Sequence, residues 1–251
     1  MKTADDSGNL RNRPPVVVSF SGVDGAGKTT QIHNLVAYLA EQGLRVRIFR
    51  FWDDIAKLTR IREGSGHAIF KGDKGIGSPE APINRRDKNV RGWPMTCVRL
   101  FLYLVDAFSL RKRFGDAMCS DAEFIIFDRY IYDELANLNL ESRATRAYIH
   151  AIMHLVPRPD VSFVLDADPE AARARKPEYP VEFIRLNRQA YLQLNGLIGG
   201  LTIIAPAGIE AAKKEVLSCT QSVLARKSTH EEGCGPILRQ HQPTQTGPTV
   251  F

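Results

Sequence analysis

The sequence predicts an α/β protein with three α/β/α layers, in which a five-stranded, mostly parallel sheet carries helices on both faces. Short apolar runs alternate with longer helical patterns, as expected for a parallel sheet whose strands are buried on both sides. The first apolar run leads directly into a glycine-rich phosphate-binding sequence, and a helical pattern follows it. With 251 residues, the chain is long enough for one such domain and its core.

The individual elements are predicted from the length and periodicity of these segments. Short apolar runs predict strands at 16–20, 44–49, 124–128, 161–167 and 201–205. Longer stretches with helical spacing predict helices at 29–42, 95–118, 142–156, 180–195 and 209–226. Gly43 directly follows the first of these helices, at a position where a left-handed residue commonly ends a helix.

These elements predict a single domain over residues 15–227. Residues 1–14 are predicted to form a polar, flexible N-terminal tail. Residues 228–251, rich in Gly, Pro, Gln and Thr, are predicted to form a disordered C-terminal tail. Residues 62–94 hold many Gly, Pro and charged residues between two regular units. A connection of that length indicates a functional loop or a disordered insertion.

The net charge of +6 is unevenly distributed along the chain. Residues 84–114 contain eight Lys and Arg against two Asp, so this segment alone has as large an excess as the whole chain. It is a candidate surface for an anionic partner, although a solvated basic face accounts for the same composition equally well.

The composition predicts a soluble, cytoplasmic protein. The four cysteines are scattered, with neither a C-x-x-C pair nor a nearby His cluster, which argues against a disulfide framework or a structural metal site. The N-terminal segment lacks the apolar core of a signal peptide. The most apolar run, VRLFLYLVDAFSL, is too short to cross a bilayer and contains Asp106.

The sequence SFSGVDGAGKTT, residues 19–30, contains the P-loop pattern G-x-x-x-x-G-K-[ST] from Gly22 to Thr29. Its glycines let consecutive backbone N–H groups face a phosphate, while Lys28 adds a positive charge and the Thr29 hydroxyl can bind Mg²⁺. A strand before the loop and a helix after it are the context of a P-loop NTPase-type fold. Binding of ATP is therefore assigned to Gly22, Asp24, Gly25, Ala26, Gly27, Lys28, Thr29 and Thr30.

The second element is FIIFDRY, residues 124–130, an apolar strand that ends in Asp128 and Arg129. Parallel sheets bind ligands at the carboxyl ends of their strands, and a P-loop protein places there the acid that holds Mg²⁺ or its water shell. Asp128 is thus a candidate metal ligand and Arg129 a candidate for binding phosphoryl oxygens. A surface ion pair is the alternative.

The third element, LDADPEAARARKPEYPVEF, has Asp168 as a predicted N-cap and Pro169 at the first helical position. A short basic stretch with Arg173, Arg175 and Lys176 follows and is broken by prolines. Arginines on a mobile segment opposite a P-loop are suited to neutralising charge on the transferred phosphoryl group. Arg173 and Arg175 are therefore candidate catalytic residues, and an exposed basic helix end is the alternative.

Two features of the predicted helix 95–118 leave a choice open. Asp106 is either a ligand contact or a core carboxylate. Phe101, Tyr103 and Phe108 are either core residues or a platform for stacking a base, and a core position is the more frequent of the two.

Together these elements resemble the thymidylate kinase family of nucleoside monophosphate kinases. GVDGAGKTT is similar to that family's phosphate loop, including the acid at Asp24, and DRY at 128–130 matches its second signature. DADPEAARAR resembles the strand end and lid entry that follow, RQAYLQL is also similar, and the resemblance covers roughly residues 16–224. It implies ATP with Mg²⁺ as the donor, a nucleotide as the acceptor, and a homodimer formed through the helix 95–118.

The resemblance also implies roles for single residues. Asp24 would lie on the acceptor side, near the sugar hydroxyl and the metal, and Arg129 would bridge the donor and acceptor phosphates. A loop with Gly25-Ala26 and no arginine implies that the catalytic arginine comes from the lid. The implied catalytic set is Lys28, Asp128, Arg129, Arg173 and Arg175, and the implied acceptor set is Asp24, Arg129, Tyr130 and Asp106.

The sequence departs from the family on the acceptor side. The segment FRFWDDIAKLTRIREGSG lacks the family's REPGGT-like sequence, whose arginine holds the acceptor phosphate, and the lid is short. Ala107 stands where the family usually has an arginine that helps to recognise thymine, and Asp133-Glu134 replace Ser-Asn. Phosphoryl transfer from ATP is therefore better supported than thymidylate as the acceptor.

The leading hypothesis is ATP-dependent phosphoryl transfer to a nucleoside monophosphate, either thymidylate or a related acceptor. A polyphosphate-using or other small-molecule kinase would also join a P-loop acid to an Asp-Arg pair. A non-catalytic ATP-binding regulatory protein would account for the altered acceptor side. No N-K-x-D guanine motif appears, which argues against a GTPase. Nucleotides are the expected partners, rather than nucleic acid or a membrane.

Overall fold

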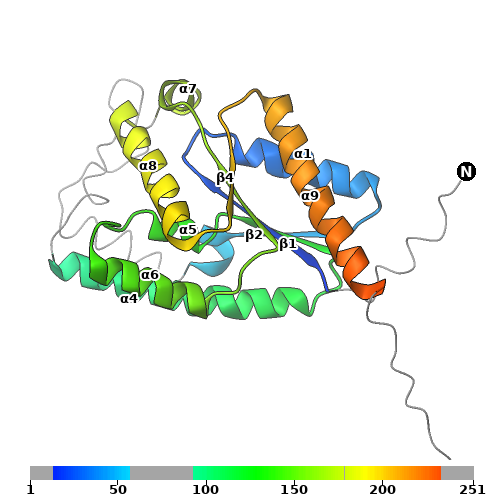
Figure 1. The fold of residues 1–251 in the computed structure, drawn as a ribbon, viewed down its shortest axis with the longest axis horizontal. Helices are drawn as coiled ribbons and strands as arrows, with labels where there is room; N and C mark the ends of the chain where they lie inside the picture. Colours follow the sequence, from blue (N-terminus) through cyan, green and yellow to red (C-terminus); the bar gives the residue numbers. More distant parts are fainter. Residues whose placement is uncertain (1–13, 57–92, 178, 233–251) are drawn as a thin grey trace, which may run out of the picture.

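The computed structural model describes residues 14–56, 93–177 and 179–232. Five strands form one sheet in the order β2-β3-β1-β4-β5, and all four strand pairs are parallel (Figure 1). The predicted five-stranded sheet is thus confirmed, and it is parallel throughout the described part of the chain. The strands are β1 (Val16–Gly22), β2 (Val46–Arg50), β3 (Phe124–Asp128), β4 (Val161–Leu165) and β5 (Leu201–Ile204).

The five predicted helices are also present, each within a few residues of its expected ends. They are α1 (Lys28–Glu41), α4 (Trp93–Met118), α6 (Arg143–Leu155), α8 (Val181–Ile198) and α9 (Ile209–Glu232). Gly43 follows α1 with a φ of 72°, as predicted for the residue that ends this helix. Helix α9 continues to Glu232, so the first part of the segment predicted as a C-terminal tail, 228–251, is helical.

Three short elements complete the described chain: η2 (Phe51–Ile55), α5 (Ile131–Leu135) and α7 (Pro169–Arg175). Helix α7 begins as predicted, because the Asp168 carboxylate accepts a hydrogen bond from the N–H of Ala171 at 2.9 Å. The π-helical turn η2 occupies the place where the sequence departs from the thymidylate kinase pattern. Nearly all of the predicted insertion 62–94 and tail 1–14 lies outside the described residues, as do residues 233–251. Within the described ranges, no helix is long and apolar enough to span a membrane.

Helices cover both faces of the sheet. Helices α1 and α9 pack on one face, and α4, α5, α6 and α8 pack on the other (Figure 1). Alternate residues of each strand point to opposite faces, so Phe20 and Ile126 pack with Leu35 of α1. Val17 and Phe127 pack on the opposite side. Burial on both faces explains why β3 and β4 are apolar except for one residue each, and why β1 is apolar except for two serines and its final glycine.

The strand order places β1 between β3 and β4, so the segments that follow these strands meet at one edge of the sheet. Phe20 of β1 pairs with Asp128 of β3, and Gly22 of β1 pairs with Leu165 of β4. The N–H of Arg129 donates to the carbonyl oxygen of Phe20 at 2.9 Å, which continues the pairing past the end of β3. The phosphate loop and the DRY sequence, far apart along the chain, are therefore neighbours.

Candidate active site

The loop between β1 and α1, residues 23–27, lies directly against two other segments. A β-carbon on Gly22 would lie 2.3 Å from the carbonyl oxygen of Leu165, and a β-carbon on Gly25 would lie 2.4 Å from that of Ala172. Both glycines also have positive φ values, 131° and 83°. Only glycine fits at these two positions, so the loop rests on β4 at one end and on α7 at the other.

Lys28 is the first residue of α1, and its side chain folds back under the loop. The ammonium group donates hydrogen bonds to the carbonyl oxygens of Gly22 at 2.7 Å and Val23 at 2.9 Å, and it lies 3.8 Å from the Asp24 carboxylate. Burial and the positive charge of Arg129 lower the pKa of Lys28 to about 8, although nearby carboxylates act in the opposite direction. The cation is thus held inside the loop, with loop carbonyl groups as its hydrogen-bond acceptors.

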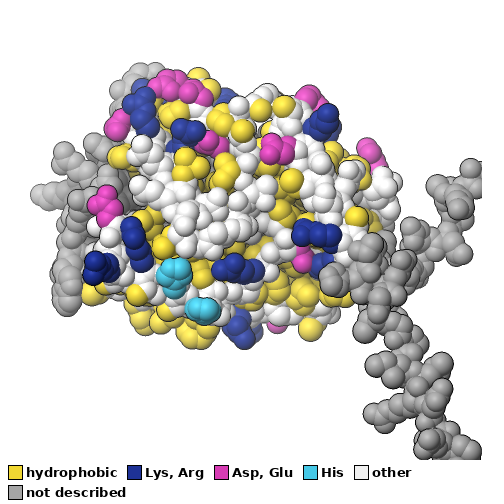
Figure 2. Space-filling model, viewed as in Figure 1, with side chains coloured by type: hydrophobic (Ala, Val, Ile, Leu, Met, Phe, Trp, Pro, Cys, Tyr) yellow, Lys and Arg dark blue, Asp and Glu magenta, His cyan; other side chains and the backbone are white. Residues whose placement is uncertain are grey.

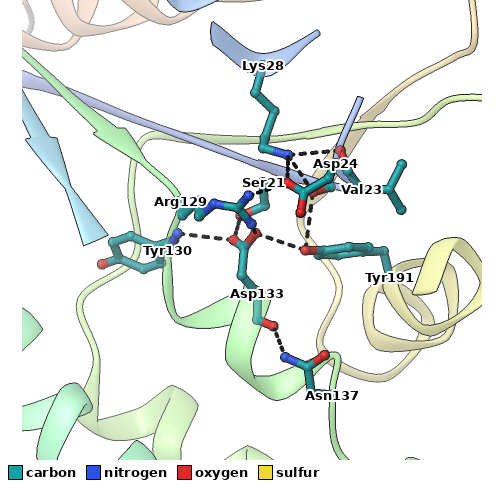
Figure 3. Close-up of polar contacts among 10 residues, drawn as sticks. Ser21, Val23, Asp24, Lys28, Arg129, Tyr130, Asp133, Asn137 and Tyr191 are labelled. Atoms are coloured by element: carbon teal, nitrogen blue, oxygen red, sulfur yellow. Dashed lines mark hydrogen bonds and ion pairs between the residues drawn. The ribbon is translucent and has the colours of Figure 1, made fainter. Parts of the chain in front are cut away.

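Arg129 follows β3 in a conformation that is rare for residues other than glycine. Its φ of 70° is the one positive value among the non-glycine residues of the described ranges. Figure 3 shows its guanidinium group between two carboxylates: it forms a close ion pair with Asp24 and a hydrogen bond of 3.2 Å with Asp133. Burial opposes the positive charge, but the two carboxylates outweigh burial and raise the pKa of Arg129.

Asp24 connects the two cations of the site. Its carboxylate pairs with Arg129 and approaches Lys28, and its side chain is 24% exposed. Burial alone would raise the pKa of Asp24, but the positive charges of Arg129, Lys28 and Lys176 outweigh burial and lower the pKa to about 2. The acid of the phosphate loop is therefore ionised at neutral pH and balances the cations around it.

Asp133 of α5, part of the pair that replaces the family's Ser-Asn, was not among the predicted site residues but belongs to the candidate site. Its side chain is only 3% exposed. It accepts hydrogen bonds from the hydroxyl groups of Ser21 at 2.6 Å and Tyr191 at 2.8 Å, from the backbone N–H of Tyr130 at 3.2 Å, and from Arg129 (Figure 3). An acid four residues after Arg129 on the following helix is a signal that sequence reasoning could have used. Ser21 and Tyr191 lie within the segments SFSGVDGAGKTT and RQAYLQL, but those segments did not assign either residue to the site.

This arrangement of phosphate loop, DRY sequence and lid has counterparts in known proteins. No protein-family model matches the chain. The probable thymidylate kinase of Methanosphaera stadtmanae is 27% identical over 183 residues, which cover 70% of this chain and 82% of that protein. The thymidylate kinase of Prochlorococcus marinus is 25% identical over 210 residues, which cover 82% and 89%. The chain is thus similar to the thymidylate kinases, at low identity.

A solved thymidylate kinase structure has the same fold as this chain. The thymidylate kinase from Ehrlichia chaffeensis matches 83% of this chain and 99% of its own, with a TM-score of 0.52 and 20% identity. The P-loop type of α/β fold predicted from the sequence is therefore confirmed.

The predicted metal ligands lie at the same edge of the sheet. Thr29 and Thr30 are exposed in the first turn of α1, directly after Gly27. Asp128 ends β3, where its negative charge acts on Lys28. The described residues contain no group of three or more His, Cys, Asp or Glu that could hold a metal. Two hard oxygen donors still fit Mg²⁺, because this ion usually takes one or two protein ligands and completes its shell with phosphate and water oxygens.

Two residues of the predicted acceptor set have side chains in the packed interior. Tyr130 is fully buried, and its hydroxyl group donates to the carbonyl oxygen of Pro157 at 2.5 Å, so only its backbone faces Asp133. Asp106 is also fully buried on α4. Burial and the charge of Asp106 raise the pKa of Tyr148 on α6 to about 12. Of the aromatic residues on α4, Tyr103 is buried, whereas Phe101 and Phe108 are exposed.

The lid entry lies beside the phosphate loop, because Gly25 packs against the backbone of α7. Lys176, directly after α7, is close enough for its charge to lower the pKa of Asp24. Arg175 is exposed and donates to the carbonyl oxygen of Ala171 at 3.1 Å, and Arg173 is partly exposed. In this conformation, Lys176 is thus the cation of the basic stretch whose charge acts on the loop acid, and it was not among the predicted site residues.

The pH dependence of stability tests the ion pair of Asp24. The folded-state pKa of about 2 lies below the ordinary value of 3.8, so ionised Asp24 stabilises the fold above about pH 4, and this contribution is lost as the pH falls towards 2. In urea unfolding we expect Asp24→Asn to be less stable than the wild type by about 2 kcal/mol near neutral pH. The gap should narrow below about pH 4 and close near pH 2. Asp121→Asn, at an exposed acid, is the control. A gap between wild type and Asp24→Asn that is independent of pH would contradict the assignment.

Proposed function

We propose that this protein is an ATP-dependent nucleotide kinase that transfers the γ-phosphoryl group of ATP to a nucleoside monophosphate, with thymidylate as the first candidate acceptor. One observation carries the proposal: Lys28 of the phosphate loop and Arg129 of the DRY sequence approach the same carboxylate, that of Asp24. The positive charges of the two motifs thus lie next to each other, as the transfer of a phosphoryl group between two phosphates requires. The relatives named thymidylate kinase support this choice of reaction.

The phosphate loop forms the donor half of the proposed site. Lys28 would exchange the carbonyl oxygens of Gly22 and Val23 for the β- and γ-phosphates of ATP. Thr29 and Asp128 would hold Mg²⁺, which supplies positive charge to the phosphate oxygens. The backbone of the loop and the start of α1 would provide N–H donors. The ATP-binding set is Gly22, Asp24, Gly25, Ala26, Gly27, Lys28, Thr29 and Thr30.

Arg129 would stabilise the charge that develops between donor and acceptor. The approach of phosphate to Arg129 releases Asp24 from its ion pair, which leaves this carboxylate free to bind a hydroxyl group of the acceptor. Arg173 and Arg175 are proposed to complete the site when the lid segment closes, since their helix already touches the loop at Gly25. The proposed catalytic set is thus Lys28, Asp128, Arg129, Arg173 and Arg175.

The acceptor assignments of Tyr130 and Asp106 fit the structure less well, since neither side chain has exposed surface. We therefore assign Tyr130 to the acceptor side through its backbone. The assignment of Asp106 to the acceptor set rests on the family resemblance alone. Two acids, Asp133 and Glu134, are buried at the start of α5, where the resemblance places acceptor contacts. Because the acceptor side differs from the family, an activity assay should test several acceptors and not thymidylate alone.

We also propose that the protein forms a homodimer through α4 and acts in the cytoplasm. Figure 2 shows hydrophobic side chains along the lower edge of the molecule, over α4. Four hydrophobic residues of α4 share one side of the helix and are between 37% and 61% exposed: Val98, Phe101, Leu104 and Phe108. An exposed apolar stripe of this kind is typical of an interface. Sedimentation velocity tests it, and a monomer at micromolar concentration would contradict it.

An acceptor panel tests the proposed reaction. Purified protein, Mg²⁺ and ATP are combined with nucleoside monophosphates, deoxynucleosides or polyphosphate, and both ADP release and product mass are followed. We expect conversion of thymidylate or another nucleoside monophosphate. The Arg129→Ala variant should lose turnover by at least about 100-fold while its affinity for ATP stays nearly unchanged. Lys28→Ala should weaken both binding and turnover.

Each other outcome of this panel has a defined meaning. Binding of ATP without turnover on any acceptor sinks the kinase proposal and favours a regulatory ATP-binding protein. Turnover with polyphosphate alone favours a polyphosphate-using kinase. Unchanged turnover in Arg129→Ala removes the role assigned to this residue.

The low pKa of Lys28 predicts a pH dependence of ATP binding. Because the cation loses its proton above about pH 8, we expect calorimetry to show constant affinity near pH 7 and weaker affinity at higher pH. The loss should approach about tenfold per pH unit. Lys28→Arg, which keeps its charge over this range, should bind ATP with little pH dependence. An equal slope in wild type and Lys28→Arg would show that another group titrates.

A further inference from the structure

We propose that Asp133 is a positioning residue that keeps hold of Arg129 while Asp24 gives this arginine up to phosphate. The inference rests on the proposed function, because it concerns the arginine assigned there to phosphoryl transfer. It gives different tasks to the two carboxylates beside Arg129: the contact with Asp133 is permanent, and the contact with Asp24 is exchanged.

The two carboxylates differ in burial and in the number of their bonds. The side chain of Asp133 is 3% exposed, whereas that of Asp24 is 24% exposed. Each oxygen of Asp133 accepts two hydrogen bonds, and the donors are Arg129, Tyr191, Ser21 and the backbone of Tyr130. A carboxylate offers about four acceptor positions, so Asp133 has none left for a ligand. It cannot turn away without breaking bonds to β1, to α8 and to the end of β3.

Asp24 is held by the two cations that would bind phosphate groups in the proposed reaction. It pairs with Arg129 and Lys28, the two cations that would turn to phosphate. Arg129 uses Nη1 for Asp133 and Nη2 for Asp24. A phosphate oxygen can therefore replace the Asp24 carboxylate at Nη2 while the bond from Nη1 to Asp133 stays in place. The guanidinium group would keep one fixed contact throughout.

Asp133 also fixes the backbone next to this guanidinium group. Arg129 has a φ of 70°, in the left-handed region that is unfavourable for any residue with a β-carbon. Its own N–H is held by the carbonyl oxygen of Phe20, and the N–H of the next residue, Tyr130, is held by Asp133. One carboxylate thus holds both the side chain of Arg129 and the turn that aims it.

Two hydroxyl groups connect Asp133 to the phosphate loop. Ser21 lies directly before Gly22 in β1, and its hydroxyl group donates to Asp133. The hydroxyl group of Tyr191 donates to Asp133 as well and lies 3.4 Å from the carbonyl oxygen of Gly22. The direction of Arg129 is therefore set relative to the loop that would hold the donor. Loss of the Asp133 charge should misalign the arginine without removing it.

The test compares Asp133→Asn with the wild type in the full chain. We expect kcat to fall by about 10- to 100-fold, because misplacing a reacting group by a fraction of an ångström has effects of this size. The Kd for Mg²⁺-ATP should change by less than about threefold, since the loop itself is intact. In an Arg129→Ala background, Asp133→Asn should cause no further loss of kcat, because its effect acts through the arginine.

A matched control is available at the opposite end of the sheet. Asp160, just before β4, also accepts a backbone N–H, from Val17 at 2.8 Å, and pairs with Lys227 at 2.7 Å. Asp160→Asn removes a carboxylate that also holds a backbone N–H and a cation, is more exposed at 27%, and lies far from the carboxyl edge. It should lower thermal stability and leave kcat unchanged.

A second readout needs no turnover and separates this inference from the proposed function. In protein with ¹⁵N-labelled arginine, the side-chain NMR signals of Arg129 should be those of an immobilised guanidinium group before and after addition of Mg²⁺-ATP. In the Asp133→Asn variant, the Arg129 signals should be those of a guanidinium group that rotates freely once Mg²⁺-ATP is added. A wild type that converts no acceptor defeats the proposed function, while these signals still test Asp133.

Either of two results with Asp133→Asn would overturn the inference. One is a double variant in which the losses from Asp133→Asn and Arg129→Ala add. The other is an Asp133→Asn protein whose Arg129 signals match the wild type. If Asp133→Asn does not fold, Tyr191→Phe and Ser21→Ala each remove one bond and keep the charge. Each should lower kcat by about two- to tenfold, and unchanged kcat in both variants overturns the inference equally.

Discussion

The partly buried positive charge of Arg129 is the constraint around which the site is built. A charge removed from water is costly unless ionic and hydrogen-bonding partners replace its hydration. The partners come from three parts of the chain: Asp24 from the phosphate loop, Asp133 from α5 and, behind Asp133, Tyr191 from α8. Each part must therefore be in place for the arginine to be stable, and the pairing of β1 with β3 brings the first two together.

This constraint also explains the acid in a loop that is built to bind anions. Without Asp24, the cations Lys28 and Arg129 would repel each other at close range, since the charge of Arg129 lowers the pKa of Lys28. A nucleotide brings several negative charges of its own, and then the carboxylate is no longer needed as a counter-ion. The loop acid thus stabilises the cations before the substrate arrives and is available for another contact afterwards.

Much of the fold could be predicted from the sequence, because most of the strands are short, mainly apolar runs and the helices between them are long enough to show a period. The five-residue helix α5 is too short for such a signal. The hydrogen bonds of Asp133 could not be predicted either, since its partners Ser21 and Tyr191 lie 112 and 58 residues away. Tyr130 shows a different limit: a motif identifies neighbours in sequence, but the left-handed turn at Arg129 sends the next side chain into the core.

The contact between Gly25 and Ala172 has a consequence for how related sequences can vary. The group that approaches the glycine is a carbonyl oxygen, and every amino acid has one. A chain that acquires a larger residue in the loop must move the whole of α7 outwards, together with the basic residues that follow it. This contact therefore requires glycine at position 25, whereas it sets no requirement on the side chain at position 172. It also fixes the distance between the phosphate loop and α7.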